Sequence, residues 1–324
     1  MMEQKGELIS FRPDIKVVDC TIRDGGLVNN FGFTDEFVKK LYETNVAAGV
    51  DYMEFGYKAS KAQFDVNSFG KWKFCDEEDI RAIVGENNTD LKIAVMADVG
   101  RTDFRKDIIP KKDSVIDMIR IATYVSTIPA AVEMINYCHD MGYETTINIM
   151  AVSTAKEEDL KLALDILAKT PVDVIYLVDS YGSLYPEEIR RMSDAYLKIA
   201  EAAGKKVGIH AHNNQMLAFA NTIEACTFGV SFLDATMSGM GRGAGNCFME
   251  LLLGFLRNPK YNIRPVFKFI ETHMNKLKEE GNVWGCDVQY MITGQRNQHP
   301  RTAITFTAEK RTDYLNFFQT IIED

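Results

Sequence analysis

Lys206-Val-Gly-Ile-His-Ala-His-Asn-Asn214 is a short, mostly apolar run that ends in two histidines and leads into residues typical of a helix start. In a β-strand, side chains two positions apart point to the same side. We therefore expect His210 and His212 to project together from the end of a strand, with Ala211 turned away. Two converging imidazoles can bind a divalent metal ion, but two histidines hydrogen-bonded in a core would show the same spacing. The rest of the chain decides between these interpretations.

This run is one of eight apolar segments whose starts are spaced roughly 25 to 40 residues apart, the length of a βα unit. Each segment is mostly continuous rather than alternating, as parallel strands covered on both faces are. Eight consecutive βα units predict a (β/α)8 TIM barrel over residues 15–258. A doubly wound sheet is the alternative, but no G-x-G-x-x-G follows the first strand. The other seven expected strands are Lys16–Cys20, Asp51–Tyr57, Leu91–Asp98, Met118–Val125, Glu144–Val152, Val174–Ser180 and Phe232–Gly239.

Helix signals lie between these strands. Thr34-Asp-Glu opens one helix that ends near Gly49, Thr154 opens another, and Pro186 occupies the first turn of a third. Residues 259–324 change in character, with an amphipathic helix expected over Val266–Glu280. We interpret them as a C-terminal helical extension that serves as a lid or an oligomer contact.

The composition is that of a soluble globular protein, and its charge argues against a nucleic-acid or anionic-membrane surface. The 324 residues have a net charge of −9, so there is no basic excess to bind phosphates or an anionic membrane. Six scattered cysteines without C-x-x-C spacing suit a reducing cytoplasm. No secretion signal is visible and no apolar run reaches the ~18 residues of a membrane span.

Catalytic groups of such barrels lie where the strands end, and polar residues gather at those positions here. Arg23 and Asp24 follow the first strand, and Asn246 follows a glycine run after the eighth. One carboxylate, from Asp24 or Asp179, together with the two histidines suffices to hold a catalytic divalent ion. Arg23 could stabilise an enolate oxygen there, although Arg23-Asp24 could also be a surface ion pair.

Three further features leave alternatives open. The glycine run Gly239–Gly245 could bind a phosphate at a helix start, or form a tight loop that brings Asn246 to the metal. Lys58 is the one lysine placed for a Schiff-base mechanism, whereas several groups support the metal route. His299 lies in a loop from which it could act as an acid or base.

Three motifs carry a resemblance to a known superfamily. Asp19-Cys-Thr-Ile-Arg-Asp-Gly25, His210-Ala-His212 and Gly241-Arg-Gly-Ala-Gly-Asn246 resemble the metal-dependent TIM-barrel aldolases, lyases and condensing synthases, which include HMG-CoA lyase. The glycine loop and the C-terminal extension are most similar to those of 4-hydroxy-2-oxovalerate aldolases.

The resemblance implies roles for individual residues. Asp24, His210 and His212 would bind Mn²⁺ or Mg²⁺, with Zn²⁺ or Co²⁺ as alternatives, and Asn246 would be a further ligand or support them. Arg23 would stabilise the enolate, and Tyr290 would correspond to the substrate-side tyrosine of the aldolases. Residues expected to line the substrate pocket are Glu54, Asn148, Asp179 and Ser180.

One departure from the aldolase pattern concerns the general base. The aldolases carry a histidine three residues after the metal aspartate, and Leu27 stands there in this chain. A leucine cannot move a proton, so the candidate substitutes are Tyr290, His299, Tyr57 and a metal-bound hydroxide. The condensing synthases do not match Gly25-Gly-Leu27 either, so neither branch supplies the substrate.

The sequence therefore predicts a divalent-metal-dependent carbon–carbon lyase that cleaves a 4-hydroxy-2-oxo acid to pyruvate and an aldehyde. The alternatives are an acetyl-CoA-dependent condensing synthase and a non-catalytic barrel that keeps its metal site. We expect a cytoplasmic protein with a small-molecule 2-oxo acid substrate. By analogy, a homodimer through the C-terminal helices and an aldehyde dehydrogenase partner are further expectations.

Overall fold

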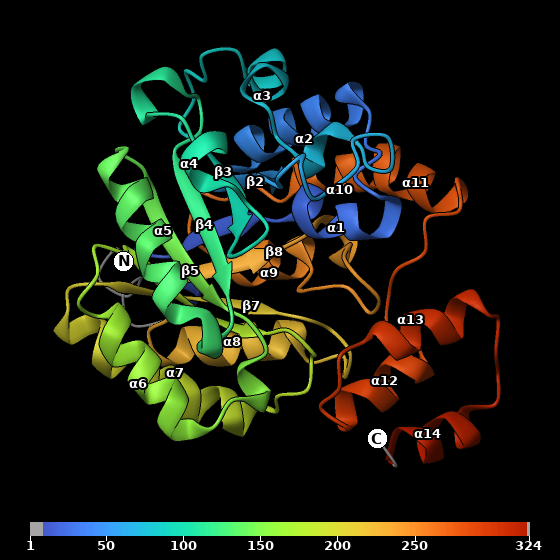
Figure 1. Ribbon diagram of the computed structural model, residues 1–324. Coiled ribbons are helices and arrows are strands. Elements are labelled where there is room, and N and C mark those ends of the chain that lie inside the picture. The colour runs from blue at the N-terminus through green and yellow to red at the C-terminus, as the bar shows by residue number, and fades with distance from the viewer. Residues whose placement is uncertain (1–8, 323–324) are drawn as a thin grey trace.

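Eight parallel strands form a closed barrel in which every strand pairs with its neighbours in chain order (Figure 1). The computed structural model describes residues 9–322. The barrel closes because β1 pairs with β2 on one side and with β8 on the other, with Val18 opposite Tyr52 and Val17 opposite Leu233. The strands are β1 (Lys16–Asp19), β2 (Tyr52–Tyr57), β3 (Lys92–Asp98), β4 (Met118–Thr123), β5 (Glu144–Ile149), β6 (Val174–Asp179), β7 (Lys206–Ala211) and β8 (Phe232–Ala235).

The TIM barrel predicted from the apolar runs is confirmed. Several predicted strands run past the observed C-terminal ends, as for β8, which was expected to continue to Gly239 and stops at Ala235. The chain leaves the sheet there because Thr236 and Met237 enter a tight turn, the 3₁₀ helix η7 (Met237–Gly239). These strand ends are where the polar side chains of the site begin.

Helices connect the strands, and most begin where the sequence indicates. Thr34 caps α2 (Asp35–Ala48) by accepting a hydrogen bond of 3.2 Å from the Phe37 N–H, and Gly49 ends it in the left-handed conformation. The start predicted at Thr154 is wrong, because Thr154 ends the 3₁₀ helix η6 (Val152–Thr154) and α6 begins at Glu157. The remaining barrel helices are α1 (Thr21–Asn29), α3 (Glu77–Val84), α4 (Phe104–Asp107), α5 (Ile128–Asp140), α6 (Glu157–Leu167), α7 (Pro186–Ala202), α8 (Ala218–Phe228) and α9 (Met249–Phe255), with short 3₁₀ helices η2 (Ile9–Phe11), η3 (Lys71–Lys73), η4 (Lys111–Asp113) and η5 (Val125–Thr127).

The barrel interior has its own small apolar cluster, separate from the larger core between strands and helices. Its members include Tyr52, Met118, Val174 and Phe232, which come from four different strands. The Tyr52 and Phe232 rings pack 5.8 Å apart between centroids. The interior is therefore a packed core below the level at which the polar residues gather.

The segment after residue 259 divides into two parts. Helix α10 (Arg264–Phe269), the π-helical turn η8 (Ile270–Met274) and α11 (Asn275–Glu279) follow one another and pack beside α2, where the Phe37 and Phe269 rings lie 5.2 Å apart. Helices α12 (Val288–Gln295), α13 (Arg301–Ala308) and α14 (Tyr314–Ile322) form a separate cluster at the side of the barrel, drawn in red in Figure 1.

This second cluster touches the loops at the C-terminal end of the barrel. The Trp284 indole donates to the Ser238 carbonyl over 3.0 Å, and the Gly285 N–H donates to the Gly243 carbonyl over 3.0 Å. The Asn297 amide donates to the Ser153 carbonyl over 2.9 Å. The loops after β5 and β8 are thus held from outside by the C-terminal helices. Within residues 9–322, no helix combines the length and apolar character that crossing a membrane requires.

Candidate metal centre

Helix α1 places Arg23 and Asp24 over the barrel, because it begins directly after β1 and both residues lie in its first turn. Two glycines allow this helix to sit so close to its neighbours. A Cβ atom at Gly25 would lie 2.8 Å from the Met240 sulfur, and one at Gly26 would lie 2.2 Å from the Phe31 ring. A larger residue at either position would push the helix, and Asp24 with it, away from the strand ends.

Asp24, His210 and His212 converge at one point, and all three are buried. The Asp24 Oδ2 atom lies 3.7 Å from Nε2 of His210 and 3.8 Å from Nε2 of His212. One ligand atom from each residue falls within 4.8 Å of the others. His210 is in β7 and His212 follows it, so their rings face the same side as the strand period requires. Asp24, rather than Asp179, is the carboxylate that lies beside the two histidines.

Asn246 lies at the same point. Its Nδ2 atom donates to Asp24 Oδ2 and, over 3.2 Å, to the Met240 carbonyl. The glycine loop brings it there through backbone contact, since a Cβ atom at Gly241 would lie 2.1 Å from the Asn246 amide and 2.9 Å from Asp24. This geometry matches the interpretation of the glycine run as a tight loop that carries Asn246 to the centre.

The donor atoms at this point fit a divalent cation. Within residues 9–322, Nε2 of His210 and Oδ1 of Asn246 are buried and have no hydrogen-bond partner. Two unpaired acceptors beside a carboxylate are a donor set that fits a divalent cation. One carboxylate and two imidazoles would leave positions open for a substrate.

The charges around this point favour the metal-binding forms of the ligands. Burial would raise the pKa of Asp24, but Arg23 and the two imidazoles outweigh it and hold that pKa well below its usual range. Burial lowers the pKa of His212 to about 3, although Asp24 acts in the opposite direction. Burial and Arg23 act to lower the pKa of His210, but the Asp234 carboxylate bonded to its Nδ1 and the nearby Asp24 carboxylate leave that pKa raised. The centre thus offers an ionised carboxylate and a neutral His212 at neutral pH.

A chain of alternating charges crosses the barrel interior and ends on both sides of the centre. Arg23 contacts Asp24 at 3.2 Å and Glu54 at 2.8 Å. Arg120 contacts the same Glu54 oxygen at 2.9 Å and Asp234 at 2.6 Å. Asp234 in turn lies 2.9 Å from Nδ1 of His210. We call these residues the charge chain; it orients both Arg23 and His210.

Two members of the charge chain, Arg120 and Asp234, were not anticipated from the sequence. Both lie inside strands, in runs that otherwise read as apolar. A lone charge in a fully buried strand is the signal that could have found them, since buried Arg and Asp are almost always paired. The Arg120 guanidinium also lies 4.6 Å from the centroid of the Tyr176 ring, which supports it from within the barrel.

The four residues expected to line the pocket take different places. Glu54 is fully buried and bound to two arginines, so it anchors Arg23. Asn148 accepts a hydrogen bond of 2.8 Å from the Thr146 hydroxyl inside the barrel. Asp179 accepts from the backbone N–H of Ser183 and Leu184, and burial raises its pKa to about 7. The Ser180 hydroxyl accepts from the Ala151 N–H over 2.9 Å, which links the loops after β5 and β6.

Of the candidate bases, Tyr57 ends β2, where the charges of Arg23 and Asp24 act on its pKa, whereas Tyr290 and His299 have other partners. The Tyr290 hydroxyl faces Thr307 of α13 at 3.5 Å, while its ring packs on the loop at Gly243. His299 lies on the rim, 3.3 Å from Arg242, and burial together with that arginine lowers its pKa to about 4. Leu27 is in α1 and is 37% exposed.

Lys58 does not point into the barrel as a Schiff-base lysine would. Its ammonium donates to the Cys75 carbonyl over 2.6 Å, in the loop between β2 and α3. This hydrogen bond holds the ammonium outside the ring of strands. Lys58 is therefore not placed to form a Schiff base with a substrate inside the barrel.

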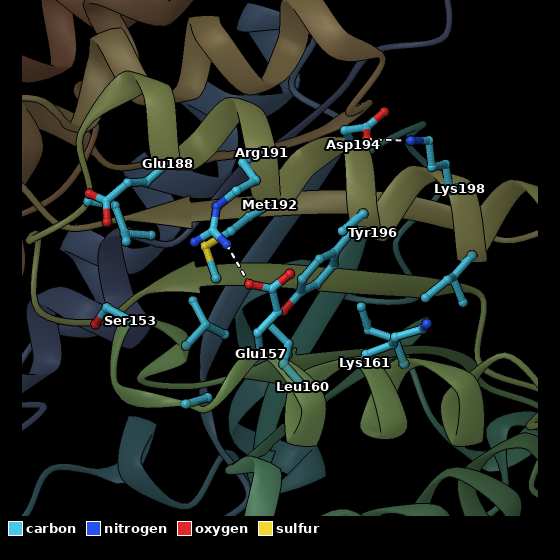
Figure 2. A pocket seen from close by; sticks show the side chains of 16 residues that line it. Ser153, Glu157, Leu160, Lys161, Glu188, Arg191, Met192, Asp194, Tyr196 and Lys198 are labelled. Atoms are coloured by element: carbon cyan, nitrogen blue, oxygen red, sulfur yellow. Dashed lines mark hydrogen bonds and ion pairs between the residues drawn. The ribbon is translucent and has the colours of Figure 1, made fainter.

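A hollow of about 350 Å³ lies between α6 and α7, outside the barrel. Figure 2 shows Glu157, Leu160, Arg191 and Tyr196 around it, with Arg191 paired to Glu157 at 2.8 Å. The hollow contains none of the predicted site residues. The chemistry suggested by the sequence is therefore confined to the barrel end.

Comparisons with known proteins show which family and which enzymes this chain is similar to. The HMGL-like family model matches residues 14–275. An oxaloacetate decarboxylase of Mycobacterium tuberculosis is 31% identical over 74% of this chain and 69% of its own length. A 4-hydroxy-2-oxovalerate aldolase of Thermus thermophilus is 30% identical over 82% of this chain and 75% of its own length.

Solved structures show the same fold. The N-terminal domain of a Bacteroides vulgatus protein described as an aldolase superposes with a TM-score of 0.79 at 29% identity, covering 91% of this chain and 97% of that domain. An HMG-CoA lyase of Brucella melitensis has a TM-score of 0.65 at 16% identity, over 82% of this chain and 99% of that enzyme. At that identity, the likeness to the lyase concerns the fold alone.

Proposed function

Because this chain belongs to the HMGL-like family, we propose that it is a divalent-metal-dependent lyase that breaks a carbon–carbon bond of a 2-oxo acid and releases pyruvate. The favoured reaction is retro-aldol cleavage of a 4-hydroxy-2-oxo acid to pyruvate and an aldehyde. The observation that carries the proposal is the convergence of Asp24, His210 and His212 beside a buried arginine.

Arg23 is the group that would act on the reacting atoms. A divalent cation held by Asp24, His210 and His212 would supply Lewis-acid polarisation of the 2-oxo acid. The enolate of pyruvate carries its negative charge on oxygen, and a fixed guanidinium nearby stabilises that charge as it develops. Glu54 and Asp24 hold Arg23 from two sides, so little reorganisation accompanies the reaction.

A second candidate function is decarboxylation of a 2-oxo diacid of the oxaloacetate type. Retro-aldol cleavage needs a base for the 4-hydroxyl proton, and Leu27 stands where the aldolases carry theirs. Decarboxylation needs no such base, because carbon dioxide leaves and its bonding electrons form the same pyruvate enolate. The oxaloacetate decarboxylase among the relatives supports this candidate.

Product analysis separates the two reactions. The Mn²⁺-loaded protein is offered oxaloacetate and a series of 4-hydroxy-2-oxo acids, while pyruvate, aldehyde and carbon dioxide are each measured. We expect pyruvate with an equal amount of aldehyde from the hydroxy acids. Carbon dioxide and pyruvate from oxaloacetate alone would favour decarboxylation, and no pyruvate from any of these acids would contradict the lyase proposal. The homodimer and the aldehyde dehydrogenase partner remain predictions.

A further inference from the structure

Lys73, at the end of η3 between β2 and α3, lies inside a cage of aromatic rings. Its ammonium nitrogen is 4.4 Å from the centroid of Tyr57, 4.5 Å from Phe64, 5.1 Å from Phe31 and 5.7 Å from Phe69. Only 7% of the residue is exposed. We call these five residues the Lys73 cage. Ring faces attract a cation, so the cage fixes the position of this ammonium.

The ammonium of Lys73 lacks the partners that neighbouring lysines have. Within residues 9–322 it has no hydrogen-bond acceptor, and no carboxylate lies within ion-pair distance of it. Lys71 contacts Asp35 at 2.7 Å and Asp79 at 3.1 Å, and Lys58 donates to a backbone carbonyl. An ammonium carries three donors, and a buried charge normally has them satisfied. These three donors, held at a fixed place, are available to an anionic ligand.

The Lys73 cage adjoins the candidate metal centre through Tyr57. Tyr57 ends β2, and burial raises the pKa of its phenol, on which the charges of Arg23, Asp98 and Asp24 also act. Burial lowers the pKa of Lys73, and Asp98, which ends β3, is the charged group that most strongly opposes this shift. The cage therefore lies at the same end of the barrel as Arg23 and Asp24.

The cage is on the side of the barrel end that the C-terminal helices leave open. Helix α12 packs on the loops after β6 and β7, since a Cβ atom at Gly294 would lie 2.9 Å from Gln215 and 3.2 Å from the Gly182 carbonyl. In an eight-stranded barrel, β6 and β7 stand across the axis from β2 and β3. Lys73 and Asp98, which belong to the β2 and β3 side, thus lie across the barrel end from α12.

We propose that the Lys73 ammonium binds a carboxylate at the far end of the substrate, so that the released aldehyde is itself an acid. This inference rests on the proposed function, which places the 2-oxo acid end at Asp24, His210 and His212. Lys73 would then determine specificity, selecting diacids over uncharged substrates of the same length, without touching the bond that breaks.

The charges of the cage favour a carboxylate over a phosphate. A single ammonium matches a single negative charge, whereas protein phosphate sites gather several donors, such as arginine forks or a helix N-terminus. The Asp98 carboxylate also lies nearby and would repel a dianion. Among the four rings only Tyr57 carries a donor, its phenol, so the cage lacks the several donors that a phosphate would need.

The test compares ligands that differ only in the far carboxylate. Binding of 2-oxoadipate and of 2-oxohexanoate to the Mn²⁺-loaded protein is measured by calorimetry, and cleavage is measured with the 4-hydroxy derivatives of both acids. Lys73→Met removes the charge and keeps an apolar chain for the rings to enclose. Lys71→Met is the matched control, because it removes a neighbouring ammonium that already has two carboxylate partners.

We expect the wild type to bind 2-oxoadipate more tightly, and Lys73→Met to lose roughly 10- to 100-fold of that preference. In the cleavage assay, Lys73→Met should show the same loss of preference as a higher KM for the diacid. The KM for the uncharged substrate should not change, and Lys71→Met should behave as the wild type. Two outcomes would overturn the inference and leave the proposed function standing. One is equal affinity of the wild type for the two acids, and the other is an equal loss of affinity for both acids in Lys73→Met. Binding of neither acid by the wild type would contradict the proposed function and the inference with it. The wild-type comparison stands even where Lys73→Met does not fold.

Discussion

Replacing His212 by alanine is expected to lower the rate of pyruvate formation by at least about 10³-fold, the order of the several kcal/mol that a Lewis-acidic cation supplies. The substitution removes one of the two imidazoles that face Asp24. The His212 ring is neutral at physiological pH because burial lowers its pKa to about 3. Its removal therefore leaves no unpaired buried charge, so the variant should fold, with loss confined to Mn²⁺ affinity and turnover.

The matched control is His139→Ala, which removes a histidine from the exposed face of α5. We expect the control to bind Mn²⁺ and to form pyruvate as the wild type does. Thermal unfolding of both variants checks that neither has lost its fold. A His212→Ala protein that retains wild-type Mn²⁺ affinity would show that this imidazole is not a ligand.

Replacing Arg120 by methionine is expected to lower the free energy of unfolding by about 3–5 kcal/mol, the range for breaking a buried ion pair from one side. Arg120 is fully buried and joins Glu54 to Asp234 in the charge chain. Without it, both carboxylates stay inside the barrel and lose a cationic partner. Denaturant unfolding of the variant and the wild type measures the difference.

The control for this prediction is Arg190→Met, since Arg190 and Glu224 form an exposed pair at 2.8 Å. Pairs of that kind contribute about 0–1 kcal/mol. A loss in Arg120→Met no larger than in the control would show that the charge chain contributes little to stability.

The pH dependence of unfolding provides a second signature of the charge chain. Burial would raise the pKa of Asp234, but Arg120 and His210 outweigh it and lower that pKa to about 2. A carboxyl whose pKa is depressed on folding stabilises the fold above its unfolded pKa of about 3.9, and this contribution is lost as the pH falls toward the folded value. Arg120→Met should lack most of this contribution, so its stability should change less than that of the wild type between about pH 4 and pH 2.

The barrel could be predicted from the sequence because each strand is a compact apolar run and the runs recur at the length of a βα unit. Strand ends were less predictable, since apolar residues such as Met237 continue into the loops while the sheet has already ended. Helix α1 was not predicted from the sequence, and its Gly25-Gly26 pair ordinarily disfavours a helix. The structure uses these glycines for close contact with Met240 and Phe31.

Some residues of the candidate site could likewise be predicted from the sequence, and others could not. The convergence of Asp24, His210, His212 and Asn246 could be predicted because all four follow or end strands, which meet at one end of a parallel barrel. Their role as metal ligands stays a prediction. Arg120 and Asp234 were missed because their partners lie on strands far apart in the chain. The Lys73 cage could not be seen in the sequence, since its rings come from three segments that only the closed barrel brings together.

The measurement that tests the central claim most directly follows Mn²⁺ binding and pyruvate release in one preparation of metal-stripped protein. Mn²⁺ is titrated in while both quantities are recorded with a 4-hydroxy-2-oxo acid present. The account predicts stoichiometric binding, with pyruvate formation rising from near zero in step with occupancy. Pyruvate formation that continues at full rate in the stripped protein, or binding that brings no pyruvate from any 2-oxo acid, would contradict it.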